Sequence, residues 1–204
     1  MASVKIHNRR SIRLKGYDYT QPGAYFITLC AQDRIHLFGQ IRHGEMKLNE
    51  FGKIVSGEWE RTTQMRPNIR TADFVVMPNH IHGILVIADD DIRRGTLQKT
   101  DVDGGGVMGR GVLQYAPTEN TNPDDMVNAP FKSPSKTIGA IIRGFKSATT
   151  KRINQLRNTP RLPVWQRNYY EHIIRNDASY HQITEYIRLN PARWEEDRLF
   201  NQLK

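Results

Sequence analysis

Residues 69–88 read IRTADFVVMPNHIHGILVIA, a stretch that decides the fold because it contains two β-strands in succession. Valine, isoleucine and phenylalanine dominate both halves, as is typical of strands. Pro78 and Asn79 interrupt the run as a turn or bulge, so we expect one strand over residues 72–77 and a second over 80–88. The other elements are placed around this pair.

The remaining elements follow from the spacing of apolar residues and from the residues that begin or end helices. In the longest expected helix, Ile138, Ile141, Ile142 and Phe145 face inward. In chain order we expect a strand over 25–30, a short strand near 46–48, a helix from the N-cap Asn49 to Pro67, the strand pair above, a helix from the N-cap Ser135 to about Arg157, a strand over 169–174, and a helix that begins at Asn176 or Asp177 and stops at Asn190-Pro191.

This order of elements predicts an α+β fold, namely a ferredoxin-like antiparallel sheet packed with helices. The length of 204 residues suits a single domain, 1–204. Residues 1–23 mix basic and turn residues and predict a basic N-terminal arm. Residues 89–131 hold eight acidic side chains, four basic ones and six glycines, a composition that predicts a flexible acidic insertion.

Composition excludes several classes of protein. No stretch approaches the ~20 apolar residues of a membrane span, and the basic first residues lack the apolar core of a signal peptide. The one cysteine, Cys30, excludes an internal disulfide and a zinc site built from several cysteines. We therefore expect no membrane partner and a cytosolic location.

The distribution of charge predicts a polyanionic partner. The chain has a net charge of +9, and residues 126–170 hold nine basic side chains without one acidic residue. Lysine and arginine neutralise phosphates, so a basic segment of this length favours nucleic acid over a merely solvated helix face.

His80 and His82 are the first candidates for chemistry. Alternate residues of a strand share a face, so both imidazoles point the same way. Two neutral imidazoles on one face can bind one divalent metal ion, and the alternative is a pair of half-buried histidines bonded to the backbone. A third ligand would have to come from elsewhere, because Gly83–Ala88 offers no further histidine or carboxylate.

The last expected helix offers such a ligand. Tyr186 and Asn190 lie four residues apart and therefore on one face of that helix. An amide oxygen is a hard ligand suited to Mg²⁺ or Mn²⁺, and a phenol could stand beside the ion. Taken singly, an asparagine before a proline is a helix end and a tyrosine beside an isoleucine is a core residue.

Taken together, these motifs resemble those of the REP-associated tyrosine transposases, members of the single-tyrosine class of HUH endonucleases. The resemblance covers nearly the whole chain except the insertion and rests on four stretches: RSIRLKGYDY (10–19), MPNHIHGI (77–84), WQRNYYEHIIR (165–175) and EYIRLNP (185–191). The pairing of His-Ile-His with a downstream Tyr-Ile-x-x-Asn-Pro is the specific part.

The resemblance implies a function and its residues. It implies that Tyr186 is the catalytic nucleophile, that His80, His82 and Asn190 bind Mg²⁺ or Mn²⁺, and that the enzyme cuts and rejoins single-stranded DNA through a 5′-phosphotyrosine. It further implies hairpin-forming DNA as the partner of a monomer or homodimer, and a location in the bacterial cytoplasm in association with the nucleoid. A non-catalytic nucleic-acid-binding protein is the alternative, and a hydrolase of small phosphoesters leaves the basic segment unexplained.

We also expect basic side chains of the arm and of the acid-free segment to contact the nucleic acid, with an outward-facing tyrosine that stacks on a base. These residues are Arg10, Arg13, Lys15, Lys136, Arg143, Lys146, Lys151, Arg167 and Tyr169.

Overall fold

The computed structural model describes residues 17–88 and 137–200 of the chain. The predicted insertion 89–131 and the first sixteen residues of the predicted arm lie outside these ranges.

Four strands form the central sheet, in the spatial order β4-β5-β1-β6, and every neighbouring pair is antiparallel. The strands are β1 (Gly23–Cys30), β4 (Ile69–Val76), β5 (His80–Ile87) and β6 (Tyr170–Ile174). The Met77 N–H donates to the carbonyl of His80 at 2.8 Å, so Pro78 and Asn79 form the turn between β4 and β5. With α1 between β1 and β4 and α2 between β5 and β6, this is the predicted ferredoxin-like arrangement.

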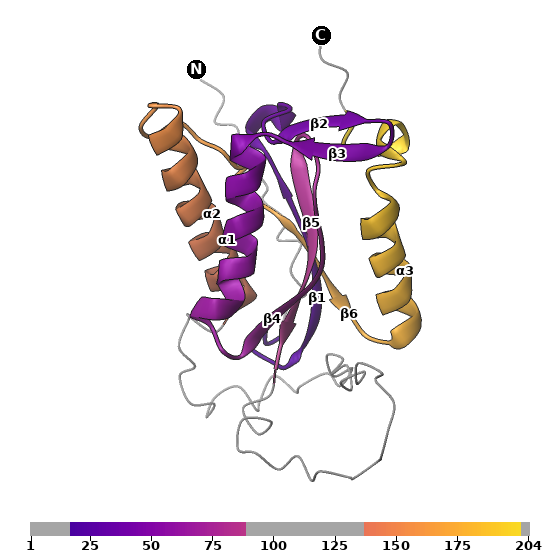
Figure 1. Ribbon diagram of the computed structural model, residues 1–204. Coiled ribbons are helices and arrows are strands. Elements are labelled where there is room, and N and C mark those ends of the chain that lie inside the picture. The colour runs from indigo at the N-terminus through magenta and orange to yellow at the C-terminus, as the bar shows by residue number, and fades with distance from the viewer. Residues whose placement is uncertain (1–16, 89–136, 201–204) are drawn as a thin grey trace, which may run out of the picture.

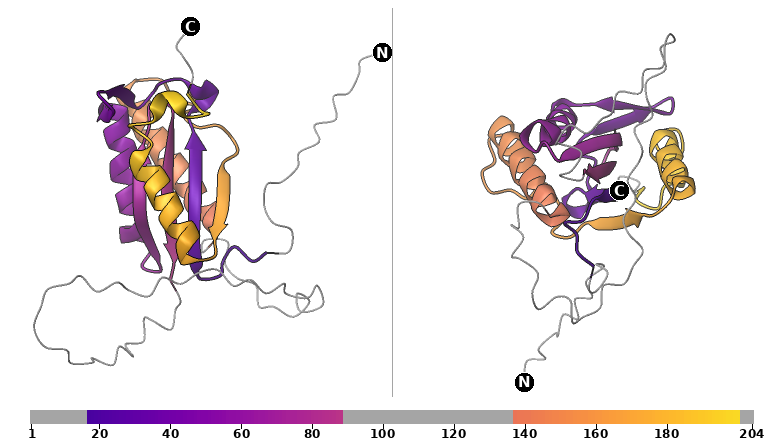
Figure 2. Two further views of the ribbon diagram at one scale, coloured as in Figure 1. Left: turned by 90° about the vertical axis from the view of Figure 1, so that its right-hand side faces the viewer. Right: turned by 90° about the horizontal axis from the view of Figure 1, so that it is seen from below.

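Three helices cover the two faces of the sheet. Helices α1 (Glu50–Met65) and α2 (Ile138–Leu156) pack on one face, and α3 (Asp177–Leu189) packs on the other (Figures 1 and 2). The alternation of side chains in β5 explains the two layers. Ile81 and Leu85 enter the core beneath α1 and α2, whereas Ile84 enters the smaller core beneath α3.

Polar N-caps begin the helices, as the sequence predicts for two of the three. Asn49 accepts from the N–H of Gly52 at 3.0 Å, and Asn176 accepts from that of Ser179 at 2.8 Å. The prediction of Ser135 as the N-cap of α2 is wrong, because Thr137 has this role and accepts from the N–H of Ala140 at 3.1 Å.

A two-stranded hairpin, β2 (Gly39–Arg42) and β3 (Glu45–Leu48), precedes α1. The sequence predicted only its second strand. His43 and Gly44 connect the strands with φ angles of 53° and 74°, the left-handed pair that a tight hairpin turn needs. Both strands expose alternate polar residues, so β2 lacks the apolar run that marks a buried strand.

Among the described residues, no helix is long and apolar enough to cross a membrane.

Candidate functional site

Two buried histidines of β5, His80 and His82, lie on the face of the sheet that α3 covers. Their Nε2 atoms face each other at 3.0 Å. Burial lowers the pKa of His80 to about 4 and holds the pKa of His82 well below its ordinary value, because the charged form is poorly solvated there. Both rings are therefore neutral near pH 7, the form that binds metal.

The tautomer of His80 follows from the amide of Asn79. The amide nitrogen donates to two main-chain carbonyls, of Arg34 at 3.2 Å and of Leu199 at 2.9 Å. The amide oxygen therefore faces Nδ1 of His80, at 2.7 Å. Since this oxygen only accepts, Nδ1 carries the proton and the lone pair of His80 lies on Nε2.

The ring of His82 is held in place by the neighbouring strand β1. The hydroxyl of Thr28 lies 2.8 Å from Nδ1 of His82, and the ring of Phe26 stacks on the imidazole at 5.4 Å between centroids. Thr28 and His82 are direct partners in the β1–β5 register. The Nε2 atoms of both histidines therefore point to one place.

Helix α3 brings Tyr186 to this place. Its phenolic oxygen lies 3.1 Å from Nε2 of His82, and its side chain is 42% exposed. Burial and the nearby carboxylate of Asp197 raise the pKa of Tyr186 to about 12, so the free phenol is protonated at neutral pH. Tyr186 is thus reachable from solvent and adjacent to the histidine pair.

Asn190, the C-cap of α3, is buried beside the same histidines. Its amide nitrogen donates to Asp197 at 3.0 Å, and its amide raises the pKa of His80, an effect smaller than that of burial. Its Oδ1 atom is buried and has no hydrogen-bond partner among the described residues. A buried oxygen without a partner is unusual, and it would suit coordination of a cation.

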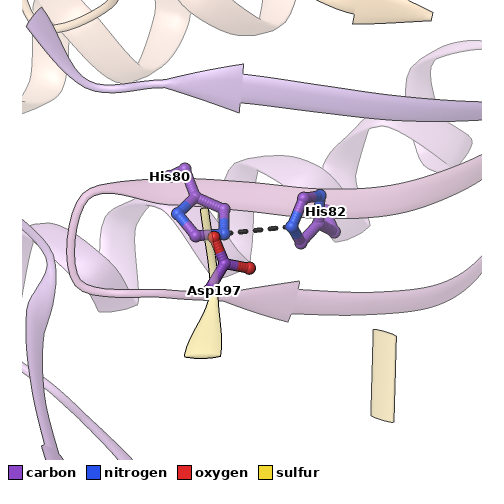
Figure 3. A group of neighbouring side chains, drawn as sticks. All are labelled: His80, His82 and Asp197. Atoms are coloured by element: carbon purple, nitrogen blue, oxygen red, sulfur yellow. Dashed lines mark hydrogen bonds between the residues drawn. The ribbon is translucent and has the colours of Figure 1, made fainter. Parts of the chain in front are cut away.

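Asp197 belongs to the same cluster, and the sequence did not predict it. One carboxylate oxygen accepts from the Tyr186 hydroxyl at 3.2 Å and from Asn190, while the other accepts from the N–H of Leu199 at 2.6 Å. Ligand atoms of His80, His82 and Asp197 all lie within 4.8 Å of one another, and Figure 3 shows the carboxylate beside the two rings. Only its acidic neighbourhood, Glu195-Glu196-Asp197, could have drawn attention to it.

An ion pair and a hydrogen bond, one on each side of Tyr186 in the sequence, connect α3 to the sheet. Arg188 donates to Asp73 of β4 at 2.6 Å, and the Thr184 hydroxyl donates to the same carboxylate at 3.3 Å. Because Thr184 and Arg188 lie two positions before and two positions after Tyr186, these two contacts orient the part of α3 that carries the phenol.

Three of the predicted nucleic-acid contacts belong to α2. This helix, which carries Arg143, Lys146 and Lys151, covers the face of the sheet opposite α3, the helix that carries Tyr186 (Figure 1). Lys146 is half-buried and donates to the carbonyls of Gln166 at 2.5 Å and Arg167 at 3.1 Å. Arg167 is exposed in the loop before β6, whereas Arg10, Arg13, Lys15 and Lys136 lie outside the described residues.

Two adjacent tyrosines stand at the start of β6, which is an edge strand. Tyr169 is half-buried against the larger core, beneath α1 and α2. Tyr170 is 37% exposed on the other face, where its ring meets Phe26 edge-on at 6.2 Å. Aromatic side chains thus flank both faces of this edge of the sheet.

No family model matches the chain. A protein of Haemophilus influenzae described as uncharacterized is 42% identical over 195 residues, which cover 96% of this chain and 94% of that protein. The chain belongs to the family of this Haemophilus protein. The match spans nearly all of both proteins.

One solved structure supports the assignment of the fold. The structure of a REP-associated tyrosine transposase bound to a REP hairpin matches with a TM-score of 0.51 and 16% identity, over 90% of this chain and 74% of that one. A candidate transposase from Deinococcus radiodurans matches with a TM-score of 0.42 and 12% identity, over 87% and 96%. The first match confirms, for the fold, the resemblance that the sequence motifs indicated.

Proposed function

We propose that this family cleaves and rejoins single-stranded DNA in a metal-dependent reaction, with Tyr186 as the nucleophile and a 5′-phosphotyrosine as the intermediate. The observation that carries the proposal is the convergence of a half-exposed phenol with two neutral imidazoles, 3.1 Å from the nearer one. The transposase fold of the chain supports the reaction class.

The cluster fits a divalent metal ion. The two Nε2 atoms lie 3.0 Å apart. Two nitrogens bound at about 2.1 Å and about 90° to one another in an octahedral ion would be separated by about 3.0 Å. The unpartnered oxygen of Asn190 and the carboxylate of Asp197 add the oxygen donors that Mg²⁺ and Mn²⁺ prefer. His80, His82, Asn190 and Asp197 would hold the ion.

Such an ion, when bound, withdraws charge from the scissile phosphate and favours the ionised phenol. The protein supplies the remaining requirements. Asn79 and Thr28 fix the rings of His80 and His82, and α3 holds the oxygen of Tyr186 beside them.

Tyr186 attacks the phosphorus, so that an oxygen–phosphorus bond forms and the bond to the leaving 3′ oxygen breaks. The phenol loses its proton and the 3′ oxygen gains one. Asp197 already accepts the hydrogen bond of the phenol and stands where this proton leaves. The ester conserves the energy of the broken bond, so a 3′-hydroxyl can reverse the step without ATP.

We propose hairpin-forming DNA as the substrate, by analogy with the REP hairpin bound to the structural neighbour, and hence action at chromosomal DNA in the bacterial cytoplasm. The predicted contacts on α2 supply positive charge for the phosphates, and Tyr169 adds an aromatic ring where it lines a hollow beside Arg143. The part of this contact set that lies on α2 is developed in the next subsection.

The test is covalent trapping with DNA labelled at one end or the other. A hairpin oligonucleotide with a single-stranded flank is incubated with protein and Mn²⁺ or Mg²⁺ and resolved under denaturing conditions. A 5′-phosphotyrosine places the 3′ label on the protein and releases the 5′ label as a fragment with a 3′-hydroxyl. Tyr186→Phe loses the adduct, whereas Tyr180→Phe, on the same helix, retains it.

Full adduct yield in Tyr186→Phe would remove the assigned nucleophile. Binding without an adduct, across varied substrates and both ions, would instead favour the non-catalytic nucleic-acid-binding protein.

A further inference from the structure

A groove runs along α2 on the face of the molecule opposite Tyr186. It has a volume of about 730 Å³ and lies between the second half of α2 and the loop over 158–167. Its cationic rim consists of Lys146, Lys151, Arg161 and Arg167. We call this feature the α2 groove. None of the described residues that line it is acidic.

The charge of the α2 groove is available to a ligand. Lys151, Arg161 and Arg167 are exposed, and none of them forms an ion pair with a described carboxylate. Arg152, on the same helix but outside the groove, is by contrast paired with Glu58 of α1. The groove therefore concentrates positive charge that the described part of the chain leaves unneutralised, as a site for phosphates does.

The floor of the groove is apolar and shaped by a fixed loop. Pro160, Pro163 and the buried residues Val164 and Trp165 line it. The loop is held in place because the Trp165 indole donates to Thr149 at 2.8 Å and Lys146 donates to the Gln166 carbonyl. A preformed apolar pocket of this size, with a polar rim, is typical of a site for a small planar group.

A second hollow of about 350 Å³ extends the groove toward the edge of the sheet. It shares Lys146 and Arg167 with the α2 groove and adds Arg143 and Tyr169. Tyr169 precedes Tyr170, whose ring is on the active-site face beside Phe26. The positive track thus continues to the β6 edge of the sheet, where aromatic rings lie on both faces.

The geometry points to a second DNA-binding site: the α2 groove binds a single-stranded segment, with phosphates on its cationic rim and one unpaired base against its apolar floor. The two sites lie on opposite faces of the sheet, so one DNA molecule would pass around the β6 edge to reach Tyr186. The choice of DNA as the polymer rests on the proposed function.

The test measures binding without chemistry. A fluorescein-labelled single-stranded 20-mer is titrated with the full chain in EDTA, by anisotropy, at several salt concentrations. The charge variant combines Lys151→Gln, Arg161→Gln and Arg167→Gln. Its matched control removes the same charge from exposed residues elsewhere, Lys47→Gln, Lys53→Gln and Arg70→Gln. A shape variant, Ser147→Phe, fills the groove without removing charge, and Ser147→Ala is its control.

We expect the charge variant to bind about tenfold more weakly or worse, and its salt dependence to decrease by about 2 in the slope of log K, since each lost single-strand contact accounts for ~0.7. The control variant stays close to the native protein. Ser147→Phe weakens binding, and Ser147→Ala does not.

Native affinity in both the charge variant and Ser147→Phe would overturn the inference. So would sedimentation showing that these variants convert a dimer to a monomer while DNA affinity is unchanged, because the groove would then be an interface between copies. A protein that binds the 20-mer through the groove but never forms a Tyr186 adduct would defeat the proposed function alone.

Discussion

The phenolic oxygen of Tyr186 lies 3.1 Å from Nε2 of His82, although 104 residues separate the two in the chain. Helix α3 and strand β5 bring them together, and the other nitrogen of His82 is bound by Thr28 at 2.8 Å. The position of the proposed nucleophile relative to the proposed metal therefore depends on a hydroxyl in a third element, β1.

Thr28→Val tests that dependence, because valine keeps the shape of threonine and removes only the hydroxyl. Without a partner for Nδ1, the orientation and tautomer of the His82 ring are no longer fixed. We therefore expect Mn²⁺ to bind about 10–100-fold more weakly, the usual effect of removing a residue that hydrogen-bonds to a metal ligand. Isothermal titration calorimetry measures this. Thr28→Ser, which keeps the oxygen, should bind like the native protein, and equal affinity in Thr28→Val would contradict the prediction.

Asp197 is expected to affect both Mn²⁺ binding and the pKa of Tyr186, and one substitution tests both effects. Asp197→Asn removes the negative charge, so we expect weaker Mn²⁺ binding, by about tenfold, because a carboxylate is the stronger ligand. The same change lowers the pKa of Tyr186 in the metal-free protein, because the Asp197 charge raises it. The pKa of Tyr186 is measured by absorbance titration, as the difference between each protein and the same protein with Tyr186→Phe. Glu195→Gln, an exposed neighbour, is the control, and a change of equal size there would argue against a specific role for Asp197.

Much of the site could be predicted from local patterns. The two histidines share a strand and the tyrosine and asparagine share a helix, so the 2.0 and 3.6 residue periods place each pair on one face. The resemblance to the transposase family then predicted that the histidine pair and the Tyr186–Asn190 pair form one site. Asp197 lies in a short segment after the last helix, where no period applies, and the 3-10 turn Trp194–Glu196 positions it.

The side of the sheet that α2 covers could not be predicted in the same way. Helical periodicity identifies the buried residues Ile138, Ile141 and Phe145, and with them the outward basic residues. It does not say which side of the sheet the helix covers. Only the tertiary structure shows that α2, which carries Lys151, and α3, which carries Tyr186, cover opposite faces of the sheet.

The glycine after His82 is required by packing rather than by backbone conformation. A Cβ at Gly83 would lie 2.5 Å from Cζ2 of Trp59 and 3.0 Å from Cδ2 of Phe74. Overpacking of a core by one methyl group costs about 1–3 kcal/mol, so we expect Gly83→Ala to lower the free energy of unfolding by this amount. Gly57→Ala, in α1 with open space around the new methyl, should instead stabilise by up to about 1 kcal/mol. Urea denaturation compares the two, and equal effects would contradict the packing argument.

The buried histidines should make the metal-free protein sensitive to acid. The folded pKa of His80 is lowered from 6.5 to about 4, so between these values the unfolded chain binds a proton that the folded chain does not. Stability is therefore fully present above pH 6.5 and declines as the pH falls toward 4, by about 2 kcal/mol between pH 7 and 5 for His80 alone. Urea denaturation in EDTA measures it. His80→Gln should flatten this dependence, while His181→Gln, at an exposed position, should preserve it; an unchanged slope in His80→Gln would exclude the buried histidine as its cause.

The anchoring of α3 predicts that Tyr186 serves the histidines of its own chain. Arg188 and Thr184 both bond Asp73 of the same chain, so the nucleophile helix is fixed to its own sheet. A mixture of Tyr186→Phe and His82→Ala chains should therefore form no more DNA adduct than either variant alone. If α3 were instead exchanged between two copies, the mixture would contain one complete site and adduct would reappear. As a control, each variant is mixed with native protein. The native chains must still form adduct, which shows that neither variant inhibits the reaction.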